Sequence, residues 1–293
     1  LALALALAAG DYLRSFLFTG FPWNLFGYVW LGAEPMLQSA GWIGIHGLGL
    51  LTLVLGGMPA ILADPPGTAP RGGAATWLGA VAALFLAIAA FGFWRLAAHP
   101  DAPLTDLRLQ IVQANVPQKE KWHPASRESH FLRSIGLSRH GQAAGAATAA
   151  DAAPDLIIWS ETAVPFFLAN EPARRAQLAA AVPRGGRMIV GAPRFARNAP
   201  AAEATVWNSL HVVGPGGGIL ATYDKRHLVP FGEFLPLRGL LARLGLDNLA
   251  QGGTDFTIGT APGVVAASAV PPFRALICYE GIFPLSRLRG PKP

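Results

Sequence analysis

Two long apolar runs near the N-terminal end constrain this chain more than any other feature of its sequence. Residues 35–63 contain no charged side chain other than His46, and residues 72–94 contain none. Each run exceeds the roughly 20 residues that an α-helix needs to cross the hydrocarbon core of a bilayer. The runs therefore predict two membrane helices, at about residues 37–62 and 74–95. The short linker between them is rich in Pro and Gly, which predicts a helical hairpin.

The residues ahead of these runs are also apolar, but turn-forming residues interrupt them. Residues 1–9 alternate Leu and Ala, which both favour helix, and they predict part of a further membrane helix. Residues 15–33 carry no formal charge and combine seven aromatic side chains with glycines and a proline. Two interpretations stay open here: a re-entrant segment with aromatics at headgroup depth, or an aromatic bend packed on neighbouring helices. His46 lies among glycines, a pattern that favours helix packing over a functional role.

The charge distribution divides the chain at about residue 98. Residues 1–98 hold three acidic and three basic residues, so the formal net charge of +6 belongs to the remainder. A basic surface fits anionic lipid headgroups or ordinary solubility, and both interpretations stay open. We expect no nucleic-acid partner. We expect a transmembrane region over residues 1–98 and a second, catalytic domain over residues 104–293.

In the second part, short apolar runs alternate with helical segments. This pattern, with a Gly-Pro-Gly-Gly hairpin turn at residues 214–217, favours a layered α/β sandwich. The predicted strands cover residues 107–116, 155–159, 187–192, 206–213, 218–223 and the run before Cys278, and the predicted helices cover 124–150, 171–181 and 237–246.

Cys278, the only cysteine of the chain, ends an apolar run over residues 273–277 and lies close to Glu280. A strand that ends in a thiol and an acid indicates a nucleophile exposed at the C-terminal edge of a sheet. A single cysteine excludes a disulfide framework and a cysteine-based zinc site, and the histidines lack paired metal-binding spacing. We therefore expect no metal and no cofactor.

Two further polar residues follow predicted strands. Glu161 comes just after residues 155–159, and Lys225 just after residues 218–223. A free thiol with a pKa of about 8.5 is mostly protonated at neutral pH, so a nearby carboxylate can accept its proton and return it to a leaving group. A nearby ammonium would stabilise a tetrahedral oxyanion. Together with Cys278, these residues predict an acyl-transfer site. Singly, each also fits a structural role: a helix N-terminal acid, a solvated basic loop, a small core residue.

Three segments carry a resemblance to a known family. Residues 159–165 read Trp-Ser-Glu-Thr-Ala-Val-Pro, residues 225–236 read Lys-Arg-His-Leu-Val-Pro-Phe-Gly-Glu-Phe-Leu-Pro, and residues 277–280 read Ile-Cys-Tyr-Glu. In this order they resemble motifs of the carbon–nitrogen hydrolase (nitrilase) superfamily, and their longer wording resembles its membrane branch, the apolipoprotein N-acyltransferases. Residues 113–122 are similar to the first-strand motif of that branch, and residues 18–24 to its membrane segment. The second position of the first motif is Ser, where the family often has Pro.

The resemblance implies a nitrilase-like α-β-β-α sandwich joined to membrane helices. It implies Cys278 as nucleophile, Glu161 as general base and Lys225 as the group that stabilises the oxyanion. Glu233 and Glu280 would support these three. The candidate lipid-binding residues are Trp122, Phe21 and Trp23.

The family's reaction has two steps. A phospholipid, typically phosphatidylethanolamine, donates an acyl chain to the cysteine, and the thioester then acylates the α-amino group of diacylglyceryl-cysteine in an apolipoprotein. The resemblance implies a multi-pass protein of the bacterial inner membrane whose catalytic domain faces the periplasm. Two other hypotheses are a membrane-tethered amidase that uses water as second nucleophile, and a non-catalytic membrane scaffold. The uncharged spans argue against the first, and the intact Glu, Lys and Cys against the second.

The ends of the chain indicate a longer parent protein. The sequence begins inside a predicted helix and stops at Pro293, shortly after the cysteine. The resemblance implies a further strand and a final membrane helix beyond that point. Activity of the 293-residue chain by itself is therefore a separate question from activity of its parent.

Overall fold

The structure is a computed structural model. It describes residues 1–63, 73–100, 106–117, 119–143, 153–196, 205–243 and 255–283. The chain divides into two compact units, Leu1–Leu104 and Thr105–Pro293. Each unit is described by itself. Of the predicted linker between the two apolar runs, residues 64–72 lie outside the described residues.

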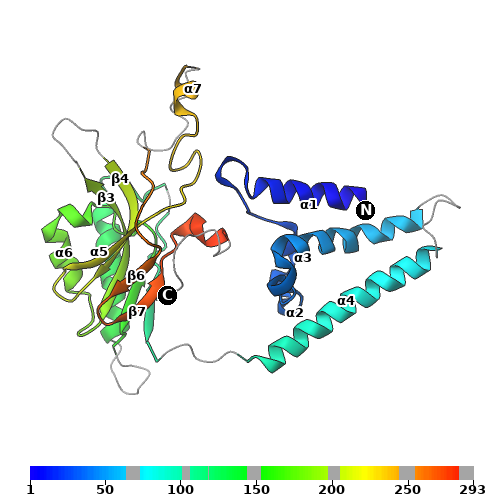
Figure 1. The fold of residues 1–293 in the computed structure, drawn as a ribbon. Coiled ribbons are helices and arrows are strands. Elements are labelled where there is room, and N and C mark those ends of the chain that lie inside the picture. Colours follow the sequence, from blue (N-terminus) through cyan, green and yellow to red (C-terminus); the bar gives the residue numbers. More distant parts are fainter. Residues whose placement is uncertain are drawn as a thin grey trace. The chain divides into compact units, whose positions relative to one another are not determined.

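The first unit is helical (Figure 1). Its elements are α1 (Ala2–Arg14), η1 (Leu17–Thr19), η2 (Phe26–Gly32), α2 (Glu34–Leu37), α3 (Ala40–Gly57), η3 (Met58–Ala63) and α4 (Gly73–Ala98). The segments Ala40–Ala60 and Gly73–Ala98 are each long and apolar enough to cross a membrane, judged by length and composition alone. They coincide with the two apolar runs of the sequence. The helix predicted at about residues 37–62 is not regular throughout. Helix α3 is kinked at Gly44, which has a φ of +69°, a conformation that glycine adopts readily.

The aromatic segment between α1 and α2 is held by a charged pair at the end of α1. The Arg14 guanidinium donates hydrogen bonds to the carbonyl oxygens of Phe21 and Trp23, at 3.1 and 2.6 Å. Asp11 pairs with Arg14 at 2.6 Å and accepts a hydrogen bond from the Phe26 N–H at 3.0 Å. These bonds fix the backbone of the segment and leave the Phe21 and Trp23 side chains about half exposed.

The second unit is built on a five-stranded mixed sheet in the order β1-β2-β3-β4-β5. The strands are β1 (Leu109–Val112), β2 (Leu156–Trp159), β3 (Arg187–Ala196), β4 (Thr205–Val213) and β5 (Ile219–Asp224). The first three are parallel, and β3, β4 and β5 are antiparallel. The predicted hairpin turn joins β4 to β5, where the Gly214 N–H bonds to the Gly218 carbonyl at 3.0 Å.

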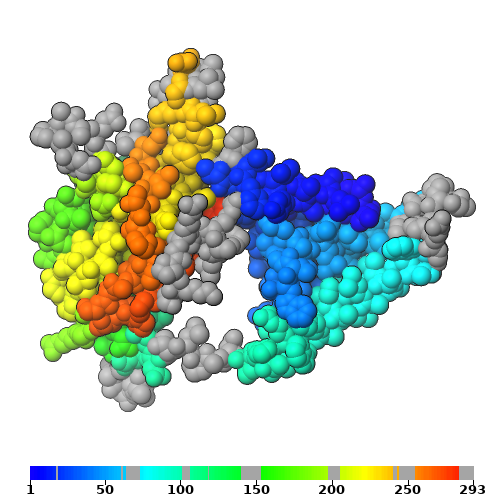
Figure 2. Space-filling view, in the orientation of Figure 1, coloured from blue at the N-terminus to red at the C-terminus, as the bar shows by residue number. Residues whose placement is uncertain are grey.

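Helices cover one face of this sheet and a second, two-stranded sheet covers the other (Figure 1). Helices α5 (Arg127–Ala143) and α6 (Pro172–Ala179) bury Phe131 and Leu178 against Ile157 and Val190. On the opposite face, β6 (Val264–Ala267) and β7 (Val270–Arg274) bury Val265 with Val212. Figure 2 shows the segment that carries this hairpin as a continuous orange strip over the unit. The remaining described elements are η5 (Leu168–Asn170), α7 (Arg238–Arg243) and η7 (Cys278–Ile282).

These layers confirm the predicted fold class, a helical N-terminal part followed by a nitrilase-like α/β sandwich. The prediction that a strand runs directly into Cys278 is wrong. Strand β7 ends at Arg274, and Cys278 begins the 3-10 turn η7 instead. The adjacent apolar residues Ala275 and Ile277 are buried on the sheet without belonging to a strand. Their burial explains why the run looks like a strand in the sequence.

Candidate active site

Glu161 follows β2 in a loop that passes very close to β3. A Cβ atom on Gly191 of β3 would overlap the backbone of residues 160–162, so only glycine allows this approach. The Val164 N–H donates to the Gly191 carbonyl at 3.0 Å. Thr162, next to the acid, has a φ of +45°. The loop is therefore held against the sheet, with the Glu161 side chain partly exposed.

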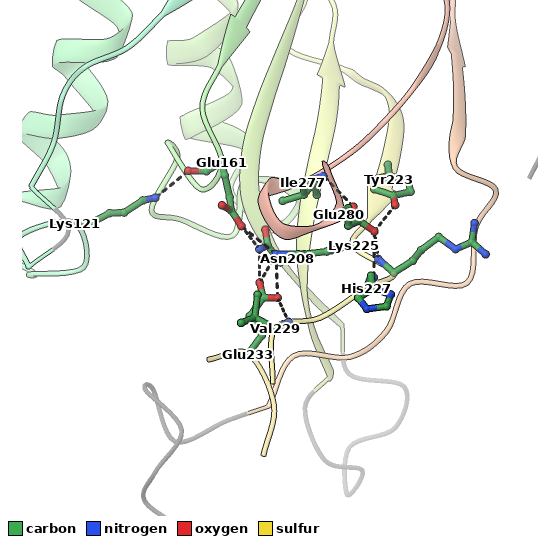
Figure 3. Close-up of polar contacts among 11 residues, drawn as sticks. Lys121, Glu161, Asn208, Tyr223, Lys225, His227, Val229, Glu233, Ile277 and Glu280 are labelled. Atoms are coloured by element: carbon green, nitrogen blue, oxygen red, sulfur yellow. Dashed lines mark hydrogen bonds and ion pairs between the residues drawn. The ribbon is translucent and has the colours of Figure 1, made fainter. Parts of the chain in front are cut away.

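Lys225 lies one residue beyond β5, and its side chain is only 1% exposed. Its Nζ atom lies 3.0 Å from the Glu233 carboxylate and 3.5 Å from Glu161 Oε1. The preceding residue, Asp224, accepts two hydrogen bonds from the Arg194 guanidinium, at 2.9 and 2.6 Å. These contacts hold one ammonium group between two carboxylates (Figure 3).

Strand β4 supplies a residue that the sequence reasoning missed. Asn208 is 2% exposed, and its Nδ2 donates to Glu161 Oε1 at 2.6 Å and to Glu233 Oε1 at 2.8 Å. The Val229 N–H donates to the other oxygen of Glu233 at 2.9 Å. The Asn208 amide and the Lys225 ammonium thus orient the carboxylates of Glu161 and Glu233. A buried amide needs partners, but the sequence does not reveal that position 208 faces this site.

Cys278 begins η7 with a φ of +48°, a conformation that costs energy in a residue with a Cβ atom. The turn is anchored by Glu280, which is fully buried. Glu280 accepts hydrogen bonds from the Tyr223 hydroxyl at 2.8 Å and from the Ile277 N–H at 2.9 Å. It also accepts from the N–H groups of the two residues after Lys225, at 2.9 and 3.1 Å. One carboxylate therefore ties the cysteine turn to the lysine loop.

The surroundings raise the pKa of the Cys278 thiol. Burial is the largest cause, the negative charge of Glu161 adds to it, and the ammonium of Lys225 opposes it. A hydrogen bond to the Glu161 carboxylate also favours the protonated thiol. Cys278 is nevertheless solvent-accessible. The resting site therefore holds a protonated thiol beside a carboxylate, which is an arrangement for general-base activation at the moment of attack rather than for a standing thiolate.

A second lysine approaches the same acid. Lys121 Nζ donates to the main-chain carbonyl of Glu161 at 2.9 Å. Burial lowers the pKa of Lys121, while attraction to Glu161 and Cys278 partly raises it. The sequence motif that contains Lys121 and Trp122 directed attention to the tryptophan, whose side chain is about half exposed.

The other predicted residues are placed as follows. Glu233 and Glu280 lie with Lys225, as described above. Phe21 and Trp23 belong to the first unit. Among the described residues, no group of three His, Cys, Asp or Glu side chains is arranged to hold a metal ion.

Comparison with known proteins gives two family matches. Residues 108–289 match the carbon–nitrogen hydrolase family, and residues 1–58 match the apolipoprotein N-acyltransferase N-terminal domain. The apolipoprotein N-acyltransferases of Brucella suis biovar 1 and Bradyrhizobium diazoefficiens are each 37% identical to this chain, over 291 and 287 residues. Each alignment covers 97% of this chain and 52% of the relative. The chain thus spans about half the length of these relatives.

Solved structures are more distant. A carbon–nitrogen hydrolase from Helicobacter pylori is 15% identical, with a TM-score of 0.34 over 56% of this chain and 48% of that one. An amidase from Nesterenkonia is 13% identical, with a TM-score of 0.37 over 62% of this chain and 59% of that one. The family match over residues 108–289 covers more than half of the chain. The chain therefore belongs to the carbon–nitrogen hydrolase family, and its relatives at 37% identity are apolipoprotein N-acyltransferases.

Proposed function

We propose that the protein to which this chain belongs transfers a fatty acyl chain from a phospholipid, through a thioester on Cys278, to the N-terminal amine of diacylglyceryl-cysteine in an apolipoprotein. The observation that carries the proposal is the Cys278 thiol hydrogen-bonded to Glu161, with the buried Lys225 ammonium 3.5 Å from that acid. The two apolar helices and the names of the relatives support a lipid substrate.

In the first step the Cys278 sulfur attacks the ester carbonyl carbon of the phospholipid. A C–S bond forms while Glu161 takes the thiol proton. Lys225 stabilises the negative charge on the carbonyl oxygen. The ester C–O bond then breaks, and the leaving lysophospholipid oxygen receives the proton from Glu161. Asn208 keeps the carboxylate aimed during both transfers.

In the second step the amine of the apolipoprotein attacks the thioester carbonyl. Glu161 accepts a proton from the nitrogen, the C–S bond breaks, and Cys278 regains a proton. Water must be kept from the thioester, or the acyl chain is lost as a free fatty acid. Glu233 and Glu280 hold the lysine and the cysteine turn in place. Trp122, Phe21 and Trp23 contact lipid.

The proposed place of the reaction is the bacterial inner membrane, with the catalytic unit on the periplasmic side. The side of the membrane on which the catalytic unit lies can be tested by labelling Cys278, with Cys278→Ser as the control for any other labelled site. A membrane-impermeant maleimide should label Cys278 in intact spheroplasts. Labelling only after the membrane is broken would place the unit in the cytoplasm and refute the orientation.

The main test follows the acyl group on the enzyme. The full-length protein, incubated with phosphatidylethanolamine, should form a hydroxylamine-sensitive acyl adduct on Cys278. The adduct should be absent in Cys278→Ser, and its formation should slow on the order of 10²-fold in Glu161→Gln because the general base is lost. Glu171→Gln, at the start of α6, is a matched control and should react normally.

Two results would contradict the proposal. An equal rate of adduct formation in Glu161→Gln would remove the base role from that residue. Release of ammonia from small amides, without any acylation by phospholipid, would favour the membrane-tethered amidase instead.

A further inference from the structure

A pocket of about 420 Å³ lies beside the proposed site, at the ends of β1 and β2. Its volume is in the range of small-molecule sites. The carboxyl ends of parallel strands are a common place for ligands in α/β sheets. The wall includes Ser160 and Thr162, the two neighbours of Glu161, and also Lys121. The pocket and the proposed general base therefore share one loop and one lysine.

The lining of this pocket favours an anion. Among the described residues that line it, none is Asp or Glu, and the two ionisable ones are Lys121 and His130. Side-chain donors come from Gln113 and Asn115 as well as from hydroxyl groups. The mostly exposed Glu120 carboxylate lies 3.9 Å from His130 Nε2, and the Glu161 carboxylate attracts Lys121 from the adjoining loop without lining the pocket. A negatively charged ligand would meet no like charge on the wall.

The two basic side chains of the wall use only part of their hydrogen-bonding capacity within the described residues. Lys121 makes no ion pair with a carboxylate in the described part of the chain, and its one hydrogen bond there goes to a neutral carbonyl. His130 Nδ1 is buried without a hydrogen-bond partner among the same residues. Burial lowers the pKa of Lys121 by disfavouring the charged form, and an anion bound beside the ammonium would favour that form again.

The proposed reaction brings a phosphate group close to Glu161. When the ester C–O bond breaks, the leaving oxygen must lie next to Glu161 to receive its proton. In a glycerophospholipid that oxygen belongs to the same glycerol that carries the phosphate. The headgroup phosphate of such a donor therefore lies only a few bonds from Glu161, whose neighbours Ser160 and Thr162 line the pocket. The acyl chain leaves the carbonyl carbon in another direction.

We propose that this pocket binds a phosphate group, with Lys121 as its counter-ion, and that in the proposed reaction this is the headgroup phosphate of the acyl donor. The inference rests on the proposed function for the identity of the ligand, but not for the existence of the anion site. Lys121 thereby acts as a residue that selects the donor.

The test compares two acyl donors on the full-length protein in detergent. Phosphatidylethanolamine carries the phosphate, and p-nitrophenyl palmitate does not. Lys121→Met should lower kcat/KM for phosphatidylethanolamine relative to p-nitrophenyl palmitate by on the order of tenfold or more, mainly through KM, because a hydrogen bond to a charged group is lost. Lys119→Met, an exposed neighbour outside the pocket wall, should leave the ratio unchanged.

A second variant controls for the possibility that the loss of Lys121 moves the Glu161 loop. Ala114→Leu narrows the pocket and leaves both charged residues in place. It should change the same ratio in the same direction. If either variant slows acylation by both donors equally, or by neither donor, the pocket does not bind the phosphate and Lys121 only supports the Glu161 loop.

Soluble competitors separate the sources of phosphate and the two proposals. Glycerophosphoethanolamine should inhibit acylation by p-nitrophenyl palmitate in the wild type and less in Lys121→Met. Equal inhibition by inorganic phosphate at equal concentration would assign the site to free phosphate and overturn the headgroup role. Acylation by p-nitrophenyl palmitate without any acylation by phospholipid would refute the proposed function, while competition through Lys121 would still support the anion site.

Discussion

At the scale of single residues, Glu161 has two opposing effects on the reactivity of the Cys278 thiol. The carboxylate raises the pKa of the thiol through its charge and its hydrogen bond. Glu161→Gln removes the charge, so the midpoint of Cys278 alkylation by iodoacetamide should move to lower pH. Acyl-adduct formation should nevertheless slow on the order of 10²-fold, because no base takes the proton during attack.

The measurement is the alkylation rate of Cys278 as a function of pH, with the rate of Cys278→Ser subtracted. Lys225→Met is the matched comparison. The ammonium lowers the thiol pKa, so its loss should move the midpoint to higher pH. If both variants shift the midpoint in the same direction, a general change in burial rather than these charges would be responsible.

A second prediction at this scale concerns Gly191 of β3, which has no side chain to take part in the reaction. Gly191→Ala places a Cβ atom where the backbone around Glu161 now lies. The loop must move, and a displacement of about 1 Å can cost on the order of 10²-fold in rate. Acyl transfer should fall with little change in thermal stability of the rest of the unit. Gly218→Ala, with open space around its Cβ position, is the control and should retain activity.

The sequence predicts Glu161, Lys225, Glu233 and Cys278 as site residues, because each follows a predicted strand or belongs to a family-like motif, and their catalytic roles stay predictions. The structure brings three of them into hydrogen-bonding or ion-pair contact. Asn208 could not be found in this way, because an amide inside an apolar strand has no meaning until its neighbours across the sheet are known. The dependence on Gly191 is likewise a matter of contact between β2 and β3, which sequence spacing does not encode.

At the scale of elements, the pairing of β4 with β5 buries a histidine. His211 is fully buried opposite Thr222, with its Nδ1 atom 2.9 Å from the threonine Oγ1. Burial lowers its pKa from 6.5 to about 4, more than the attraction of Asp224 raises it. The unfolded chain therefore binds a proton near pH 6.5 that the folded unit binds only near pH 4. Stability should fall as the pH drops through this window.

The free energy of unfolding should fall by about 2 kcal/mol between pH 7 and pH 5. This fall should be seen as a lower denaturant midpoint in tryptophan fluorescence. His211→Gln keeps a polar side chain but does not titrate, so the difference between pH 7 and pH 5 should shrink by that amount. A variant with the same pH dependence as the wild type would show that His211 is not the titrating group.

The elements that could be predicted from the sequence are those with a clear local residue pattern. The strand expected at 206–213 corresponds to β4, and the turn that follows it has its own glycines. The cysteine run was misjudged because apolar residues bury against a sheet equally well outside a strand. The helix expected over 124–150 is described only as α5, which ends at Ala143, and residues 144–150 lie outside the described residues.

At the scale of the whole molecule, two kinds of helix share one chain. In α4, none of the most apolar window is buried within the structure. In α5, Phe131 and Ile135 pack on the sheet, and only the outer face is open. The same physical rule gives both outcomes, because an apolar surface must be covered either by lipid or by a protein core. The apolar composition of α4 is enough to predict that lipid covers it. The buried face of α5 can be identified only once the sheet that it packs on is known.

This difference can be tested with one substitution placed in each unit. Leu86, near the middle of α4, and Leu132, on α5, both have substantially exposed side chains. Arg at the centre of a membrane helix costs about 2.5–3.5 kcal/mol for insertion, so Leu86→Arg should lower the fraction of the full-length protein in which α4 is inserted in the membrane, measured by protease protection. Leu132→Arg should leave that fraction unchanged, because its side chain faces water. Equal protection of both variants would show that α4 does not face the hydrocarbon core and would remove the membrane support for a lipid substrate.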